Sequence, residues 1–478
     1  MRIDVCRDTK RGFHKAQGKV EAMSVTRRLV NYIINARFEN IPEKAVSRTK
    51  EFILDEIGNA LGGTAMNSGK IITKWAKQLG GSPEATLFGD GAKVPAAIAS
   101  GVNTQLCMGL ELMETYKNRG HPGSGMVMAA LALGEREKTS GQDIITAVCT
   151  AYDVTGRIID ATFPSPEHRR RVWNSSWQGC GPLVVATKLL GLDEEQGMNA
   201  FGMGLGNSPT MNVHNILYVP ASMSKCGNQF HSFVAIGAAQ LARLGYTGYY
   251  EILDEPFAYW TTISDNNDWD IYTRDLGKDF YITSALAFKP WPSCRWAQGG
   301  IQSLLEIMST HGLTCQDIVE VIYHAHEKVT GYPFDNVNPS SVEDSYWSVP
   351  WAFANAALGY KVGPAWYAEE RFSDEEHKQF MQKVKINTLP EAVEAFVNEP
   401  QKSITRLEVK TREGKVYTKG TEYCKGDPQQ PMTHEEIIEK FLSQTEGVIS
   451  RGNADKVIEL VEKLEQLSNV SEITRLGY

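Results

Sequence analysis

Residues 24–283 carry apolar positions at helical spacing. Within 40–63, apolar side chains recur four or seven residues apart, which puts them on one helix face: Val46, Ile53, Ile57 and Leu61. Gly62 and Gly63 then supply a stop. Segments rich in Ala and Leu continue this pattern at 126–135, 143–161, 181–192 and 233–245. The pattern predicts an all-α domain that runs from Ser24 to about Thr283.

After about residue 284, apolar residues recur at every second position, which is the period of a β-strand. In 317–326, alternate residues collect on one face, namely Val319, Val321, Tyr323 and Ala325. In 404–411, Leu407 and Val409 alternate with charged residues, and Arg412–Lys415 is typical of a hairpin turn. We expect a smaller α+β domain over 284–430.

Helical spacing returns near the C-terminus. Thr433 and Glu436 have the spacing of a capping box. Apolar residues then line one face of a final helix: Val457, Leu460, Val461, Leu464 and Leu467. A chain of 478 residues exceeds what one hydrophobic core organises, so two domains are expected. The last segment, 431–478, either stands alone or rejoins the first domain, and residues 1–23 are expected to be an extension.

Composition and charge are those of a folded globular protein. Apolar residues make up 42% of the chain and charged residues 22%. The net charge of −8 gives no general attraction to nucleic acid or anionic membranes, and no long apolar run predicts a membrane span. Eight scattered cysteines without a Cys-x-x-Cys pair favour a reducing compartment. We expect a cytoplasmic protein, or a mitochondrial matrix protein if residues 1–23 are a presequence.

Common cofactor and metal motifs are missing from the sequence. There is no Walker phosphate loop, and the glycines of 202–206 lack the spacing and preceding strand of a dinucleotide site. His324 and His326 could bind a metal, but no third ligand is indicated, and both are expected on a solvated strand face. A serine hydrolase is disfavoured because no Gly-x-Ser-x-Gly elbow occurs. We therefore expect neither a metal nor a cofactor.

The main candidate for chemistry is the segment 111–125, ELMETYKNRGHPGSG, which combines two carboxylates with a lone histidine and a turn. Gly120, Pro122 and Gly123 cannot continue a helix. His121 titrates near neutral pH, and a histidine held in such a loop suits proton abstraction or donation. The alternative is a capping or core histidine without a chemical role.

Two further segments carry positive charge that could bind carboxylates. Lys225 ends the Met-Ser-Lys run of 223–225, and Lys289 and Arg295 bracket two prolines in 288–296. Lysine and arginine bind carboxylates through charge-assisted hydrogen bonds. Taken singly, each is more often a solvated surface charge, so only their joint placement would support a binding site.

Several segments, in the same order along the chain, resemble the MmgE/PrpD family: NIPEKAVSRTKEFILDEIGNALGG (40–63), GHPGSGMVMAALALGE (120–135), KLLGLDEEQ (188–196), MSK with AAQLARLGYTG (223–225 and 238–248), and KPWPSCRW (289–296). The family includes dehydratases, decarboxylases and epimerases of small acids. The resemblance spans about residues 24–470. It implies an all-α domain completed by the C-terminal helices, a smaller α+β lid domain, a homodimer and no metal.

The resemblance also implies a set of site residues between the domains. The implied residues are Glu111, Thr115, His121, Lys225 and Lys289, with Arg295 as a neighbour. We expect the first four to be catalytic and Lys289 and Arg295 to contact the substrate. Ser124 and Trp173 are further expected substrate contacts, and Trp173 would make the pocket bulkier or more apolar. His121 would move a proton at the carbon next to a substrate carboxylate. The lysines and Arg295 would hold the carboxylates, and Glu111 with Thr115 would orient His121 or a leaving hydroxyl.

The chain departs from the family pattern at the same places. Glu111, Met113 and Glu114 stand where the family has aspartates, and histidines are missing from 172–174 and 225–228. These changes indicate a substrate other than methylcitrate or cis-aconitate.

The sequence as a whole predicts a metal-independent lyase of the hydro-lyase type that acts on a small di- or tricarboxylic acid. Isomerisation or epimerisation begins with the same proton abstraction, and decarboxylation is a third outcome. From another class, a non-catalytic acid-binding or scaffold protein stays open, because two family histidines are missing.

Overall fold

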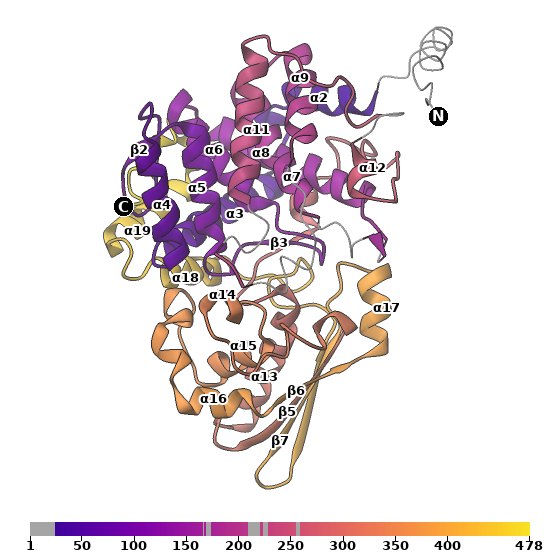
Figure 1. Cartoon of the computed structure of the whole chain (residues 1–478), viewed down its shortest axis with the longest axis vertical. Coiled ribbons are helices and arrows are strands. Elements are labelled where there is room, and N and C mark those ends of the chain that lie inside the picture. Colours follow the sequence, from indigo (N-terminus) through magenta and orange to yellow (C-terminus); the bar gives the residue numbers. More distant parts are fainter. Residues whose placement is uncertain (1–23, 166, 169–173, 209–219, 223–227, 255–258) are drawn as a thin grey trace, which may run out of the picture.

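Helices fill the upper body of the molecule in Figure 1, here called the helical body. The computed structural model describes residues 24–165, 167–168, 174–208, 220–222, 228–254 and 259–478. The first helices of this body are α2 (Val25–Asn35), α3 (Glu43–Gly63), α4 (Asn67–Leu79), α5 (Ala96–Met108), α6 (Gly123–Glu137), α7 (Gly141–Ala161), α8 (Cys180–Leu189), α9 (Glu194–Gly206), α11 (Asn228–Arg243) and α12 (Trp260–Ile263). Its short strands pair antiparallel, β1 (Ala85–Thr86) with β2 (Lys93–Val94) and β3 (Thr115–Tyr116) with β4 (Leu286–Ala287).

The C-terminal helices belong to the same body. They are α18 (His434–Thr445), α19 (Arg451–Glu462) and α20 (Ser471–Thr474). α18 and α19 lie against α3, and α20 lies against α6. Phe441 and Val457 are buried in one hydrophobic core with Phe52 and Ile57. The helical body therefore has two parts in sequence but one core.

The lower body in Figure 1, here called the sheet body, combines helices with one larger sheet. Its helices are α13 (Gln298–His311), α14 (Val342–Ser345), α15 (Val349–Ala357), α16 (Glu375–Met381) and α17 (Pro390–Asn398). Its strands are β5 (Ile318–Ala325), β6 (Val384–Thr388), β7 (Thr405–Thr411) and β8 (Val416–Thr421), in the order β6-β5-β7-β8. β5 and β6 run parallel, and the other neighbours are antiparallel. A second core fills this body.

The predicted fold class, a mainly helical protein with a smaller α+β part, is confirmed. In α3, Ile53, Ile57 and Leu61 are buried as their spacing predicts. The capping box of Thr433 and Glu436 is present at the start of α18. None of the described helices has both the length and the apolar character that crossing a membrane requires.

Two details of β5 differ from the prediction. Val319 is 41% exposed, and Ile318 is buried in its place. The cause is a register shift between Ile318 and Glu320 against β7, because an irregularity of this kind moves a residue out of the alternation. His326 was predicted to be solvated but is buried, with its ring edge-on to Trp296.

The last predicted helix is also shorter than its apolar pattern. α19 ends at Glu462, and Leu464 lies in a separate 3₁₀ turn, η9 (Leu464–Gln466). Leu467 follows this turn and packs against the same core. The apolar face therefore continues while the helix does not.

The close approach of α3 to α5 sets the start of the loop that carries the candidate residues. A Cβ atom on Gly63 would lie 1.9 Å from the main-chain oxygen of Leu106. Only a residue without a side chain allows this contact. α5 ends two residues later, at Met108, and the chain then enters the loop toward Glu111.

We expect Gly63→Ala to destabilise the protein by about 2–3 kcal/mol, since backbone atoms must move apart. Gly237→Ala in α11 is the matched control, because a Cβ there meets no atom within 4 Å. It should be neutral or stabilising by up to about 1 kcal/mol. Urea unfolding followed by circular dichroism measures both. Equal stabilities of the two variants would contradict the close approach.

Candidate active site

A short strand pair brings the two main candidate segments together. Thr115 lies opposite Ala287 and Tyr116 opposite Leu286, in the antiparallel pair of β3 and β4. Lys289 follows β4 by two residues, so the pairing carries it to the segment that contains Glu111. The sequence resemblance placed both in one site, and the strand pair is the physical link between them.

Glu111 and Lys289 form a buried ion pair. Lys289 Nζ lies 3.2 Å from Glu111 Oε1, and both side chains are 0% exposed. Lys289 also donates to the main-chain oxygen of Ser293 at 3.2 Å and lies 3.4 Å from Met113 Sδ. Glu111 adopts a left-handed backbone conformation, with φ of 55°. This conformation is costly for a residue with a side chain, so the ion pair helps to hold it.

His121 follows a tight turn. Tyr116 and Gly120 form a bridge that closes the turn, and α6 starts two residues after His121. His121 Nδ1 lies 2.6 Å from the main-chain oxygen of Glu114. A carbonyl oxygen only accepts hydrogen bonds, so Nδ1 carries the proton in the neutral ring and Nε2 carries the lone pair. His121 is partly exposed, whereas Glu111 and Lys289 are buried.

The hydroxyl groups of the predicted site shape the loop. Thr115 Oγ1 donates to the main-chain oxygen of Lys117 at 2.9 Å, inside the turn. Ser124 Oγ donates to Glu56 Oε2 at 2.8 Å, which joins the start of α6 to α3. Both residues are buried. Their predicted roles toward a substrate stay predictions.

Arg295 lies in the second core with an acidic partner. Its Nη2 atom is 2.5 Å from Asp427 Oδ1 and donates to Ser403 Oγ at 3.1 Å. The Asn118 side chain, in the turn before His121, donates to the main-chain oxygen of Lys402 at 2.6 Å. The Asn118 main-chain N–H donates to the oxygen of Pro400 at 2.9 Å. The turn therefore contacts the segment of the sheet body that also contacts Arg295.

Two predicted site residues, Lys225 and Trp173, lie outside the described residues. Ser222 lies in the described part and joins the two bodies. Its main-chain oxygen accepts from Gln105 Nε2 at 3.2 Å, and its hydroxyl donates to Glu343 Oε1 at 3.4 Å.

Sequence reasoning missed two cations beside His121. Lys117 Nζ and Arg119 Nη1 each lie 2.5 Å from one oxygen of Asp160. Two cations of this turn therefore share the carboxylate of Asp160. Lys117 and Arg119 lie four and two residues before His121 in the segment 111–125. Their closeness to His121 in the sequence was the signal that could have identified them. Asp160 lies on α7, and nothing in the sequence pairs it with them.

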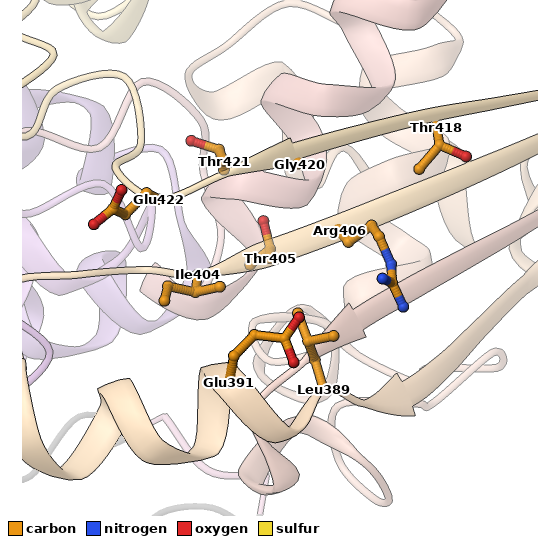
Figure 2. A pocket seen from close by; sticks show the side chains of 9 residues that line it. All are labelled: Leu389, Glu391, Ile404, Thr405, Arg406, Thr418, Gly420, Thr421 and Glu422. Atoms are coloured by element: carbon orange, nitrogen blue, oxygen red, sulfur yellow. The ribbon is translucent and has the colours of Figure 1, made fainter.

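Two surface pockets of the described residues lie away from His121. One has a volume of about 360 Å³ and lies between β7, β8 and α17. Its lining residues, which include Glu391, Arg406 and Glu422, are drawn in Figure 2. A second, of about 600 Å³, lies where Lys361 faces the turn between α18 and α19. Neither is lined by a predicted site residue. Among the described residues, no group of three or more His, Cys, Asp or Glu is placed to hold a metal ion.

Known proteins resemble this chain along nearly its whole length. Cis-aconitate decarboxylase of Mus musculus is 22% identical over 468 residues, which cover 95% of this chain and 93% of that protein. Cis-aconitate decarboxylase of Homo sapiens is 21% identical over 470 residues, 95% of this chain and 94% of that protein. Residues 27–272 match the MmgE/PrpD N-terminal domain, and residues 291–466 match the MmgE/PrpD C-terminal domain. The chain belongs to the MmgE/PrpD family.

Proposed function

We propose that this protein is a lyase that acts on a small di- or tricarboxylic acid by proton transfer at a carbon next to a carboxylate. The observation that carries the proposal is the geometry of His121, whose Nδ1 faces the oxygen of Glu114 at 2.6 Å. A histidine fixed in this way presents Nε2 as a proton acceptor, or as a donor once protonated. Family membership and the names of the two relatives support a carboxylic acid as the substrate.

Two outcomes fit this proton transfer. In decarboxylation, the bond to one carboxylate breaks, carbon dioxide leaves, and the electron pair left on carbon takes a proton from the His121 imidazolium. In dehydration, His121 takes a proton from carbon and the electron pair expels a hydroxyl group. The names of the relatives favour decarboxylation. A hydro-lyase is the second candidate. Epimerisation would result if the proton returned to the opposite face of the same substrate carbon.

The charges around His121 suit an anionic substrate. Lys117 and Arg119 lie in the turn before His121, and their cationic groups, which meet at Asp160, would favour an anionic substrate over a neutral one. Lys289 is already paired with Glu111, so we assign this pair to the shape of the loop rather than to direct substrate contact. Arg295 is likewise buried and paired, with Asp427, so we assign this pair to the shape of the site as well. Lys225 keeps its predicted role as a carboxylate contact. A homodimer stays a prediction that sedimentation would test.

We expect His121→Ala to lower kcat by about 10²–10⁴-fold, as is typical when a proton-transfer group is lost. Wild type and variant are incubated in deuterated water with cis-aconitate, hydroxy-tricarboxylates and amino-dicarboxylates. Release of carbon dioxide, loss of water, or deuterium exchange alone distinguishes the outcomes.

His434→Ala is the matched control, because His434 is exposed at the start of α18 and pairs with Glu462 at the end of α19. It should leave turnover unchanged. Normal turnover by His121→Ala would overturn the proposed role of His121. Binding of an acid by the wild type, without turnover or exchange, would instead identify an acid-binding protein.

We expect Glu111→Gln to cost about 3–5 kcal/mol of stability, because it leaves the Lys289 ammonium buried without a carboxylate. The double variant Glu111→Gln, Lys289→Met should regain most of this loss, since it removes both charges. Urea unfolding measures the four members of this cycle. Lys378→Met, which breaks the exposed pair with Glu375, should change little. Additive losses in the double variant would contradict the ion pair.

A further inference from the structure

Glu56 on α3 holds both sides of the loop that carries His121. Glu56 Oε1 accepts from the main-chain N–H of Glu114 at 3.2 Å, and Glu56 Oε2 accepts from Ser124 Oγ at 2.8 Å. The Glu56 side chain is 0% exposed. One buried carboxyl group on a long helix thus fixes the chain seven residues before His121 and three residues after it.

Glu114 is the residue through which this hold reaches the imidazole ring. Its main-chain N–H is held by Glu56, and its main-chain oxygen accepts from His121 Nδ1 at 2.6 Å. Its side-chain Oε1 accepts from the main-chain N–H of Gly123 at 2.5 Å, at the first turn of α6. A movement of Glu114 would therefore move the partner of His121.

The number of charges in this cluster requires a proton. Each of the two buried lysines has its own carboxylate: Lys289 pairs with Glu111 at 3.2 Å, and Lys440 pairs with Asp55 at 2.5 Å. Among the ion pairs of the described residues, none includes Glu56 or Glu114. Lys440 also stabilises the Glu56 carboxylate electrostatically, although its ion pair is with Asp55. A second ionised carboxylate at Glu114 would still be very costly, and carboxyl pairs in such surroundings share one proton.

The hydrogen bonds indicate which carboxyl group holds the proton. Both oxygens of Glu56 accept from donors, as an ionised carboxylate does. Glu114 Oε2 is buried and has no donor in the described part of the chain, so it suits a carboxylic acid O–H. Burial, with the nearby Glu56 carboxylate, raises the pKa of Glu114 well above its usual range, and burial also raises the pKa of Glu56. The hydrogen bonds therefore assign the proton to Glu114.

The other titratable groups that face the pair come from three helices. Tyr152 on α7 lies close, because a Cβ on Gly123 would lie 2.1 Å from Tyr152 Oη and 2.7 Å from the Glu114 carboxyl carbon. Cys107 on α5 donates to the main-chain oxygen of Glu56 at 3.5 Å. Asp55 on α3 is neutralised by Lys440. Burial raises the pKa of Tyr152 and Cys107, so both stay neutral and add no further negative charge.

We propose that Glu56 and Glu114 work as one proton-sharing carboxyl pair, with Glu56 ionised and Glu114 protonated, and that this pair positions His121 for proton transfer. Neither residue contacts the substrate in this proposal. The pair fixes the Nδ1–H form of His121 through the oxygen of Glu114. Its single negative charge stabilises the imidazolium that forms when Nε2 holds a proton. The kinetic part rests on the proposed function.

Infrared spectroscopy tests the shared proton without any substrate. At pH 8, exposed carboxyl groups are ionised, so a C=O stretch of a protonated carboxylic acid reports a buried acid. We expect this band in the wild type and its loss in Glu114→Gln. Glu135→Gln is the control, because buried Glu135 accepts from an N–H and a hydroxyl of Thr86, as Glu56 does from its partners, but is ionised in a pair with Lys93. This control should keep the band.

Kinetics then test the positioning role. Gln imitates a neutral acid but not a carboxylate, so we expect Glu56→Gln to lower kcat at least about tenfold more than Glu114→Gln does. KM should change less than kcat, because neither residue contacts the substrate. Glu135→Gln should leave kcat unchanged even if it lowers stability.

The proposal is overturned if the wild type has no acid band at pH 8, if the band survives in Glu114→Gln, or if Glu56→Gln loses no more kcat than Glu135→Gln. A wild type that turns over none of the acids would contradict the proposed function instead. The band, with its loss in Glu114→Gln, would then still support the carboxyl pair. Should Glu56→Gln fail to fold, the infrared comparison of wild type and Glu114→Gln decides alone.

Discussion

The arrangement of the candidate site depends on the pairing of Thr115 with Ala287. This contact joins segments that lie far apart in the sequence, and both continue directly into charged residues. Strands of two residues pair weakly without other support. Glu111 and Lys289 supply it on one side, and the Asn118 contact with Pro400 supplies it on the other. The strand pair, the ion pair and the turn therefore form together, and His121 takes its place from all three.

Buried charge is concentrated around this pairing, although the sheet body also buries the pair of Arg295 and Asp427. A buried ion pair contributes little to stability compared with apolar residues of the same volume, but breaking one is costly. Such pairs therefore serve geometry better than stability. Lys440 illustrates this, because it neutralises Asp55 and also donates to the main-chain oxygen of Leu112 at 3.0 Å. The C-terminal helix α18 thus fixes the loop near Glu111. The second part of the helical body therefore contributes to the candidate site as well as to the shared core.

Periodicity predicted the elements of the fold well and their contacts poorly. The apolar face of α3 and the hairpin of β7 and β8 follow directly from spacing in the sequence. The irregularity at Ile318 could not be predicted, since one shifted residue leaves the composition unchanged. His326 was predicted to be solvated because alternation assigns a face but cannot place Trp296 and Phe396 around it.

Prediction of the candidate site was limited by long-range pairing. The resemblance identified Glu111, His121 and Lys289, and the structure brings Glu111 and Lys289 into contact. The resemblance could not indicate that the ammonium group of Lys289 is already paired with Glu111 rather than open to a substrate. Glu56 offered a local indication that was overlooked: an acid between Ile53 and Ile57 lies on the apolar side of a helix. Asp160 gave none, because its partners Lys117 and Arg119 lie on another element.

The number of protons that must be transferred favours decarboxylation over dehydration within the proposed function. Carbon dioxide leaves without a proton, so decarboxylation needs a single donor to the carbon that remains. Dehydration needs a base at carbon and also a proton for the departing hydroxyl group. Of the predicted site residues in the described part, His121 is the one histidine, and its side chain is partly exposed. The histidines that the family pattern would add are absent from 172–174 and 225–228. One histidine in the described part of the site is better matched to the reaction that transfers one proton, and the proposed carboxyl pair behind His121, which would stabilise its protonated form, serves the same reaction.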